Sequence, residues 1–398
     1  SMTTGGNNTS TTYSGIISGT GNVTKTGTGA WTVAGNNTYS GTTAISNGTL
    51  RLGAEGNGTH SPLGTIAAAT TVASGATLDL NGITLSTAEA LTISGTGVSS
   101  AGAITNSSAT AASYSGLITM AAASTISTNS GDINITNTGT ITGATFGLTL
   151  GGSGNGSIAS IIGTTSGTLT KSGTGTWTVS GNNTFTGTTT ISAGTLKLGA
   201  NGDATNTPLG TVGNGTTVSS GATLDLNGYT LGTAEALNLS GTGASSAGAL
   251  TNTGTDATYS GNITLGAAAT IVANTSGLLT VSGNCSGNNA LTLSGSGDGV
   301  LSGVRSGTST IVKTGTGTWT LSGANTYTGA TTISVGTLKL GASTSVNTSG
   351  PLGTTGGGVT VASGASLDLN GYSLTGTATE ALSINGTGVG GLGALTNS

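Results

Sequence analysis

Apolar residues along this chain stand in short runs in which every second position is polar. Leu50-Arg51-Leu52, Leu78-Asp79-Leu80 and Leu91-Thr92-Ile93 are typical. A period of two indicates a β-strand that buries one of its faces. The many β-branched Thr residues suit strands, while the Gly, Asn and Ser residues that fill the intervening stretches suit tight turns. No segment has helical spacing over a useful length, so the pattern predicts an all-β fold.

A long block of sequence occurs three times, which gives repeats of about 24–169, 170–311 and 312–398, the last of them incomplete. Each copy continues with a PLGT sequence, an LDLNG sequence and then a Glu. Shorter echoes of the forms aromatic-x-Gly and Leu-x-Leu recur inside each copy. Short strands, tight turns and a coil-sized internal repeat predict a β-solenoid, because each coil can bury its thin apolar face only by stacking on its neighbours.

We therefore expect residues 1–398 to be one continuous β-solenoid, an elongated rod that is a fragment of a longer chain. With about 20 to 28 residues per coil and about 4.8 Å between neighbouring strands, its length would be roughly 70 to 95 Å. The alternative is a string of β-sandwich domains. The sequence LDLNGYTL from Leu224 favours a hairpin with an Asn-Gly turn, but the echoes within each repeat favour the solenoid.

The composition excludes several classes of partner. Only 5% of the 398 residues are charged, against about 25% in ordinary globular proteins. The net charge of −4 gives no basic surface for nucleic acid or for an anionic membrane. One Cys and one His leave no disulfide framework, and we expect neither a metal nor a cofactor. No run approaches the roughly 20 apolar residues of a membrane span, so we expect no insertion into a membrane.

Paired carboxylates would suggest a polysaccharide-degrading enzyme, but the acids that recur lie several coils apart and cannot form one pair. They are Asp79, Asp225 and Asp368, and Glu89, Glu235 and Glu380. Each Asp points away from its flanking Leu residues, which predicts a solvated acid on the outer face. The recurring bases receive the same interpretation. They are Lys25, Lys171 and Lys313, and Arg51, Lys197 and Lys339.

The remaining chemical groups are scattered. An enzyme would need unrepeated acids to converge, and the candidates are Glu55, Asp132, Asp203 and Asp256. Asp298 and Arg305 are close enough in sequence to form a surface ion pair. Cys285 has no basic neighbour in sequence and is expected to be an inert thiol. His60 is expected to be a solvated loop residue. We therefore predict no catalytic residues.

Three kinds of uncharged side chain define the repeat. The Trp residues share a face with an apolar residue two positions on, which predicts core positions, with an exposed sugar-binding row as the alternative. The Asn residues precede Thr-aromatic-Gly, which predicts a turn in which Asn takes left-handed backbone angles. The aromatic residues follow at a fixed spacing. The positions are Trp31, Trp177 and Trp319, then Asn37, Asn183 and Asn325, and then Tyr39, Phe185 and Tyr327.

The segment from Gly315 to Gly341, with its Trp319, its Asn-Thr-Tyr sequence and its Gly-Thr-Leu sequence, resembles the autotransporter-associated β-strand repeat. This repeat occurs in the passenger regions of bacterial autotransporters and of large surface proteins. The resemblance extends over about 30 residues in each of the three copies. It implies a right-handed parallel β-helix outside a bacterial cell, either secreted or at the cell surface, and it implies no catalytic residues.

The expected function is that of a non-enzymatic extracellular stalk or adhesive shaft. The first alternative is an adhesin module that binds surface glycans, host cells or neighbouring cells through the looser segments 105–165 and 251–306. Thr-rich alternation also raises ice binding, against which stand variable coil lengths and the Trp and Lys residues that interrupt the Thr rows. A polysaccharide-degrading enzyme is the remaining alternative. The end coils suggest end-to-end self-association.

Overall fold

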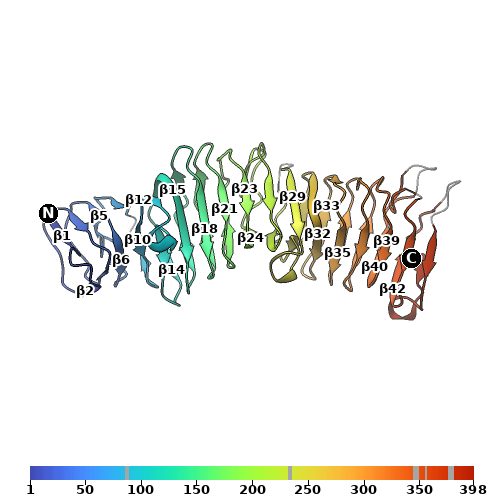
Figure 1. The fold of residues 1–398 in the computed structure, drawn as a ribbon, viewed down its shortest axis with the longest axis horizontal. Coiled ribbons are helices and arrows are strands. Elements are labelled where there is room, and N and C mark those ends of the chain that lie inside the picture. The colour runs from blue at the N-terminus through green and yellow to red at the C-terminus, as the bar shows by residue number, and fades with distance from the viewer. Residues whose placement is uncertain (86–88, 232–234, 344–348, 355, 375–380) are drawn as a thin grey trace. The chain divides into compact units, whose positions relative to one another are not determined.

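The computed structural model describes residues 1–85, 89–231, 235–343, 349–354, 356–374 and 381–398. Within these ranges the chain is all-β, apart from three short 3-10 turns, η1 (Val98–Ser100), η2 (Ala244–Ser246) and η3 (Val389–Gly391). It folds into two compact units. The first unit is Ser1–Thr190 with Asn206–Thr211, and the second is Ile191–Thr205 with Val212–Ser398. In each unit short strands stack in parallel, coil upon coil (Figure 1).

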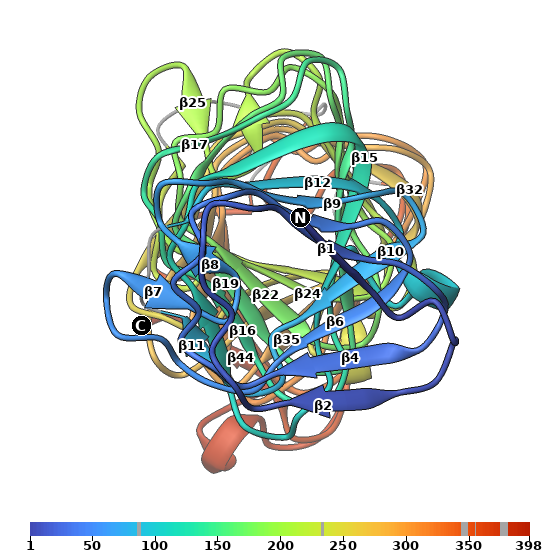
Figure 2. The same ribbon diagram turned by 90° about the vertical axis from the view of Figure 1, so that its left-hand side faces the viewer.

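Two parallel ladders carry the first repeat of the first unit. One ladder joins Val23, Thr43, Thr70 and Leu91 in register. Its strands are β3 (Val23–Lys25), β5 (Thr43–Ile45), β9 (Thr70–Val72) and β12 (Leu91–Gly95). The other ladder consists of β2 (Thr11–Tyr13), β4 (Ala30–Val33), β6 (Gly48–Leu52), β10 (Ala76–Asp79) and β13 (Ile104–Asn106). Figure 2 shows β2, β4 and β6 on one side of the coils and β9 and β12 on another.

A third ladder completes the coils of the first unit. It consists of β11 (Thr84–Leu85), β14 (Ala112–Tyr114), β16 (Ile133–Ile135), β19 (Gly156–Ile158) and β22 (Thr176–Val179). Inward residues alternate with outward ones along the short strands, as in the buried, half-buried, buried pattern of β3. The inward Leu, Ile and Val side chains stack in columns, and each contributes about 1.5 to 3 kcal/mol of burial free energy.

The second unit has the same construction. One of its ladders is β33 (Leu279–Val281), β36 (Gly299–Leu301), β38 (Thr318–Leu321), β40 (Gly336–Leu340) and β42 (Ala365–Asp368). A second ladder is β35 (Leu291–Gly295), β37 (Ile311–Lys313), β39 (Thr331–Ile333), β41 (Val359–Val361) and β43 (Leu382–Ile384). The predicted all-β, parallel β-solenoid is therefore confirmed, and the β-sandwich alternative is wrong. That a single solenoid runs through residues 1–398 stays a prediction.

The looser segments contain the two longest strands, β15 (Ile118–Thr128) and β32 (Ile263–Ala273), each of 11 residues. The start of β15 pairs with β12, and its end pairs with β13. One continuous strand therefore passes round a corner that other coils of the first unit make with a turn. Strand β32 does the same in the second unit, where it pairs first with β29 (Leu237–Gly241) and then with β30 (Leu250–Asn252).

The Asn-Gly turn after β10 forms, but it makes a corner and not a hairpin. Asn81 and Gly82 both have positive φ angles, of 51° and 75°, and the Ile83 amide donates to the Leu80 carbonyl at 2.9 Å. The strands on either side pair in parallel with other coils and not with each other. The Asn-Gly sequence specifies a local change of chain direction, but the stacking of the coils decides which strands pair.

The length of the long repeat does not correspond to a whole number of coils, so equivalent strands of successive copies lie on different ladders. In the first unit the second copy begins with β21 (Leu169–Lys171), which extends the ladder of β4 through β13, β15 and β18 (Leu148–Gly152). Strand β3, its equivalent in the first copy, lies on a different ladder. In the second unit β37, which begins the third copy, lies on the ladder of β28 (Ala222–Asp225). Equivalent residues of successive copies therefore do not form a row on one face.

Candidate functional site

The repeated Trp residues lie in the core. Trp31 is 3% exposed, and Trp177 and Trp319 are fully buried. The indole N–H of Trp177 donates to the Gly151 carbonyl at 3.0 Å, and that of Trp319 donates to the Ser294 carbonyl at 2.9 Å. The predicted core position is confirmed, and the alternative of an exposed sugar-binding row is wrong for these residues.

Two of the Trp rings stack on a glycine of the preceding coil. Gly156 pairs with Trp177 and Gly299 pairs with Trp319 in the parallel ladders. A Cβ atom at either glycine would lie 2.6 Å from the ring, which is closer than van der Waals contact allows. The Trp ring therefore fits only because the residue paired with it in the preceding coil is a glycine.

The side chain of each repeated Asn residue forms hydrogen bonds with the backbone of neighbouring coils. Asn37 Oδ1 accepts from the Ile17 amide at 2.8 Å, and its Nδ2 donates to the Pro62 carbonyl at 2.8 Å. Asn183 and Asn325 make the same two bonds, to Ile162 and Pro208 and to Arg305 and Pro351. All three are fully buried, and none has a positive φ angle.

The prediction of left-handed angles at Asn37, Asn183 and Asn325 is therefore wrong. The repeated Asn residues that do have positive φ angles are those of LDLNG, namely Asn81, Asn227 and Asn370. The buried Asn residues instead form a bridge with the residue that precedes the PLGT sequence, as between Asn37 and Ser61. A buried amide needs partners for both its donor and its acceptor, and adjacent coils supply them.

The aromatic residues that follow are also buried. Tyr39 is 1% exposed, and Phe185 and Tyr327 are fully buried. The Tyr39 hydroxyl bonds the Thr43 hydroxyl, and the Tyr327 hydroxyl bonds the Thr331 hydroxyl at 2.6 Å. Each ring packs on the glycine of a PLGT sequence, which has a positive φ angle. These glycines are Gly64, Gly210 and Gly353.

Three repeated lysines are inside the coils and not on the surface. Lys25, Lys171 and Lys313 are at most 1% exposed. Lys25 Nζ donates to the carbonyls of Thr26, Gly27 and Asn47 at 2.6, 2.9 and 3.1 Å. The ammonium group thus satisfies the carbonyls of a tight corner and of the corner one coil above. The prediction of solvated bases is wrong at these positions, because carbonyls turned inward at a corner need a donor.

The other two lysines repeat this arrangement. Lys313 Nζ donates to the carbonyls of Thr314, Gly315 and Val335 at 2.8, 2.7 and 3.0 Å, and Lys171 Nζ donates to those of Ser172 and Gly173. Burial lowers the pKa of Lys171 and of Lys313 to about 8. Both ammonium groups are therefore mainly charged at neutral pH.

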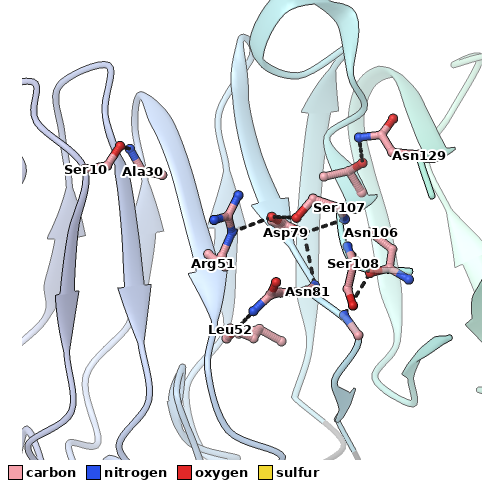
Figure 3. Close-up of polar contacts among 12 residues, drawn as sticks. Ser10, Ala30, Arg51, Leu52, Asp79, Asn81, Asn106, Ser107, Ser108 and Asn129 are labelled. Carbon is pink, nitrogen blue, oxygen red and sulfur yellow. Dashed lines mark hydrogen bonds and ion pairs between the residues drawn. The ribbon is translucent and has the colours of Figure 1, made fainter. Parts of the chain in front are cut away.

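The repeated Asp residues are buried under a polar cover, contrary to the prediction of solvated acids. Asp79 is 1% exposed. Its Oδ2 accepts from Arg51 Nε at 2.8 Å and from Ser107 Oγ at 2.6 Å, while its Oδ1 accepts from the amides of Asn81 and Ser107, both at 3.0 Å (Figure 3). The side chain does leave the apolar side of its strand, but the turn of the next coil folds over it.

Asp225 and Asp368 have the same set of partners, namely the amide of the Asn two residues on, the amide and hydroxyl of a residue in the next coil, and a basic side chain. Lys197 Nζ lies 3.4 Å from Asp225, and Lys339 Nζ lies 3.5 Å from Asp368. Burial raises the pKa of Asp368, but the hydrogen bonds from Ser398 and Asn370 and the charge of Lys339 outweigh it and hold the pKa below its usual value. With every carboxylate oxygen engaged by donors, these acids stabilise corners and are poorly placed for proton transfer.

Unrepeated acids cap turns of the following coil. Asp132 Oδ1 accepts from the Asn155 amide at 2.9 Å, and Asp256 Oδ1 accepts from the Leu278 amide at 2.9 Å. Asp298 Oδ1 accepts from the Thr318 amide at 3.1 Å. Sequence reasoning missed this role. The signal available is the spacing of about one coil between each acid and the turn that it caps.

Arg305 is buried, so the predicted surface ion pair with Asp298 is wrong. Its side chain points into the coil, where Nη2 donates to the Asn289 carbonyl at 2.9 Å and Nη1 donates to the Gly287 carbonyl at 3.0 Å. Cys285 lies beside it in a parallel bridge. Burial raises the pKa of Cys285 to about 11, although the charge of Arg305 lowers it. The expectation of a buried thiol is confirmed, but Cys285 does have a basic neighbour.

Glu89 and Glu235 are also buried, at 0% and 1% exposure. Thr70 Oγ1 donates to Glu89 Oε1 at 3.1 Å, and Thr216 Oγ1 donates to Glu235 Oε1 at 3.0 Å. Glu380, the third acid of this set, lies outside the described residues. These buried carboxyls contradict the prediction of solvated acids, because each side chain turns inward to a Thr hydroxyl of an adjacent coil.

Exposed hydroxyls and methyls form a column on one ladder of the first unit. Thr3, Thr24, Ala44, Thr71, Thr92, Thr119 and Thr142 lie in register. Buried Lys25 and Trp31 do not interrupt this column, although the sequence suggested that such residues would. Four of the seven are exposed and the others are half-buried. The column is therefore an uncharged, periodic outer surface.

No group of three or more His, Cys, Asp or Glu side chains in the described parts of the chain could hold a metal ion. His60 is half-buried and bonds Thr59 Oγ1 through Nδ1 at 2.9 Å. No helix among the described residues is long and apolar enough to cross a membrane.

The sequence model of the passenger-associated-transport-repeat family matches residues 23–52, 169–198 and 311–340. The chain thus carries three copies of this repeat, and the resemblance to an autotransporter passenger repeat is confirmed. The first match begins with β3 and ends with β6, and it includes Trp31, Asn37 and Lys25. No curated protein and no solved structure matches the chain.

Proposed function

We propose that this chain is a non-enzymatic β-solenoid segment that acts as a rigid stalk or adhesive shaft of a secreted or surface-exposed bacterial protein. The three passenger-associated-transport repeats support a position outside the cell. Stacked coils supply length and stiffness, because each coil is held by its neighbours along continuous ladders.

One observation carries this proposal. The repeated Trp, Asn, aromatic, Lys and Asp side chains are at most 5% exposed in all three copies. Their polar atoms bond other coils, as Asn37 and Lys25 do. The residues that distinguish the repeat are therefore engaged in stacking, and they are not available to a ligand or a substrate.

Solution scattering tests the stalk. A rigid shaft is expected to give a rod-like profile with a cross-section of one coil and a length of roughly 70 to 95 Å. A profile of a compact particle, or of two units moving freely about a joint, would contradict a rigid shaft.

The exposed Thr column favours one second candidate, an adhesin that binds glycans. Beads coated with the protein are exposed to a glycan array and to bacterial and epithelial cells, with heat-unfolded protein as the control. The stalk predicts no saturable binding. Binding that is lost in the double variant T92K and T119K, and kept in T360K of the second unit, would instead establish the adhesin.

A further inference from the structure

A carboxyl group is enclosed inside the first unit without a cation to balance its charge. Glu89 is fully buried, and none of the ion pairs found among the described residues includes it. Its Oε1 accepts from the Thr70 hydroxyl at 3.1 Å, whereas its buried Oε2 has no hydrogen-bond partner among the described residues. The Ser61 hydroxyl lies near enough to lower the pKa of the carboxyl. Hydroxyl groups alone stabilise a neutral carboxyl well but compensate poorly for the burial of a carboxylate.

The elements around Glu89 bring only phenols toward it. Tyr39, before β5, and Tyr114, on β14, lie near enough for a charge on Glu89 to raise the pKa of both. The Tyr114 hydroxyl donates to the Glu89 carbonyl at 2.8 Å. His60 precedes Ser61 on β7 (His60–Ser61), but its ring is half-buried and bonds Thr59. Among the described residues, no Lys or Arg forms an ion pair with Glu89.

Ser61 belongs to a buried ribbon, residues 60–65, that pairs β7 with β8 (Gly64–Thr65) and contains the first PLGT sequence. The Thr43 hydroxyl donates to the Leu63 carbonyl at 2.7 Å, and the Thr65 amide donates to the Tyr39 carbonyl at 3.1 Å. Glu89 thus bonds the ladder strand β9 through Thr70, and Ser61 of the ribbon lies near enough to lower the pKa of Glu89.

The second unit contains an equivalent carboxyl. Glu235 is 1% exposed, Thr216 Oγ1 donates to its Oε1 at 3.0 Å, and the Tyr259 hydroxyl donates to its backbone carbonyl at 2.9 Å. Thr216 is on β27 (Thr216–Val218), and Tyr259 is on β31 (Ala257–Tyr259). In the third copy Val359 stands where the first two have Thr70 and Thr216. The hydroxyl donor is therefore absent from that copy.

We propose that Glu89 is a pH-sensitive latch, which in its protonated form holds the neighbouring buried segments in place and on ionisation allows those segments to open locally. This inference does not depend on the proposed stalk function. It concerns the 60–65 ribbon and β9.

The expected pH range follows from the direction of the shift. Burial raises the pKa of Glu89 from 4.5 to about 8, although the hydrogen bonds from Thr70 and Ser61 lower it. The closed state therefore binds a proton more tightly than the open state does. Closure is fully stabilised below pH 4.5 and weakens as the pH rises to about 8. Between pH 6.5 and pH 9, the opening equilibrium should rise roughly 30-fold.

Hydrogen exchange of the full chain at pH 6.5 and pH 9, corrected for the intrinsic rates, tests the latch. In the wild type, amides of residues 60–65 and 70–72 should lose protection by roughly 30-fold at pH 9. Peptides of β17 (Thr140–Thr142) and β20 (Ile161–Gly163) contain no ionisable residue and serve as the internal reference. The E89Q variant keeps an oxygen that accepts from Thr70 but cannot ionise, so its protection should be the same at both pH values.

E55Q is the matched control, because Glu55 is an exposed acid in the loop before the ribbon. It removes the same charge and should behave as the wild type does. Should E89Q fail to fold, T70V gives a second reading, because it removes the hydroxyl that lowers the pKa of Glu89 and should shift the loss of protection to higher pH. A loss of protection below 3-fold in the wild type, or a pH-dependent loss that persists in E89Q, would overturn the proposal.

Discussion

The matched repeats and the looser segments turn the same kind of corner in two different ways. In the first repeat, β3 ends at Lys25 and a Thr-Gly-Thr-Gly turn leads to β4. In the looser segment, β15 passes through the corner between the same two ladders without a break. The turn leaves carbonyls pointing inward, which Lys25 satisfies, whereas at the bend of the continuous strand the Ala122 carbonyl accepts from the Ser124 hydroxyl of the same strand at 2.9 Å.

This difference explains where the charge of a nearly uncharged protein is placed. A continuous corner needs no cation, and the residues at the bend of β15 are alanines, Ala121 to Ala123. A tight corner needs a donor that reaches several carbonyls at once, and an ammonium group has three N–H donors. Lys25 pairs with Thr4 on one side and with Ile45 on the other, so it ends an apolar column that begins at Ile45.

The substitution K313M should give the largest effect. It leaves the carbonyls of Thr314, Gly315 and Val335 without their donor, which should cost about 3 kcal/mol of local stability. K339M is the matched control, because Lys339 is 30% exposed and 3.5 Å from Asp368, and should cost at most about 1 kcal/mol. Hydrogen exchange in β39 and β40 measures both. Equal effects of the two variants would contradict the corner role of Lys313.

The substitution G299A should come next. The added Cβ would lie 2.6 Å from the Trp319 ring, so the ring or the strand must move, at a cost of about 2 kcal/mol. G213A makes the same change where no atom lies within 4 Å, and it should be nearly neutral. Thermal unfolding followed by Trp fluorescence compares them, and a G299A melting temperature equal to that of G213A would show that the coil adapts freely.

The substitution N325A should cost somewhat less, about 1.5 kcal/mol. It removes the bonds to the Arg305 amide and the Pro351 carbonyl, at 2.7 and 2.8 Å. Asn284 accepts from the Val304 amide at 3.0 Å in an exposed turn, where water can replace the lost bond. N284A should therefore change stability by less than about 0.5 kcal/mol. Hydrogen exchange of the Arg305 amide measures the effect directly. Unchanged protection of this amide in N325A would contradict a stabilising role for the bonds of Asn325 to neighbouring coils.

The substitution A268T should have the smallest effect, below about 0.5 kcal/mol. Ala268 lies at the exposed bend of β32, where a side chain meets only solvent and a β-branched residue suits the strand. Thermal unfolding tests this prediction. A loss of stability comparable to that of G299A would mean that the continuous corner tolerates substitution no better than a tightly packed position. The proposed difference between the two kinds of corner would then be wrong.

Alternation along the strands was sufficient to predict the class of fold and the burial of Trp31, Trp177 and Trp319. It did not decide the burial of Asp79 and Lys25, which end their strands. Lys25 lies on the same buried face as Val23, and the prediction that it is solvated came from its charge. For Asp79, alternation correctly predicts that the side chain leaves the apolar face. It cannot predict that Ser107, one coil later, folds over the carboxylate.

The assignment of Asn37 failed for a related reason. Its partners, the Ile17 amide and the Pro62 carbonyl, are 20 residues before it and 25 residues after it. Nothing in the local sequence distinguishes an Asn that bonds neighbouring coils from an Asn that forms a local turn. The left-handed conformation was instead at Asn81, where a glycine follows directly and allows a second positive φ angle.

The sequence by itself determined that this protein is a stack of short parallel strands, because a period of two with frequent Gly and Asn permits little else and a coil-sized repeat requires stacking. Only the tertiary structure decided which polar groups are inside. It also decided that β21 extends the ladder of β4, which places successive copies of the repeat on different ladders. The physical reason is that strand order along the chain is local, whereas register between coils depends on the number of residues in every corner between them.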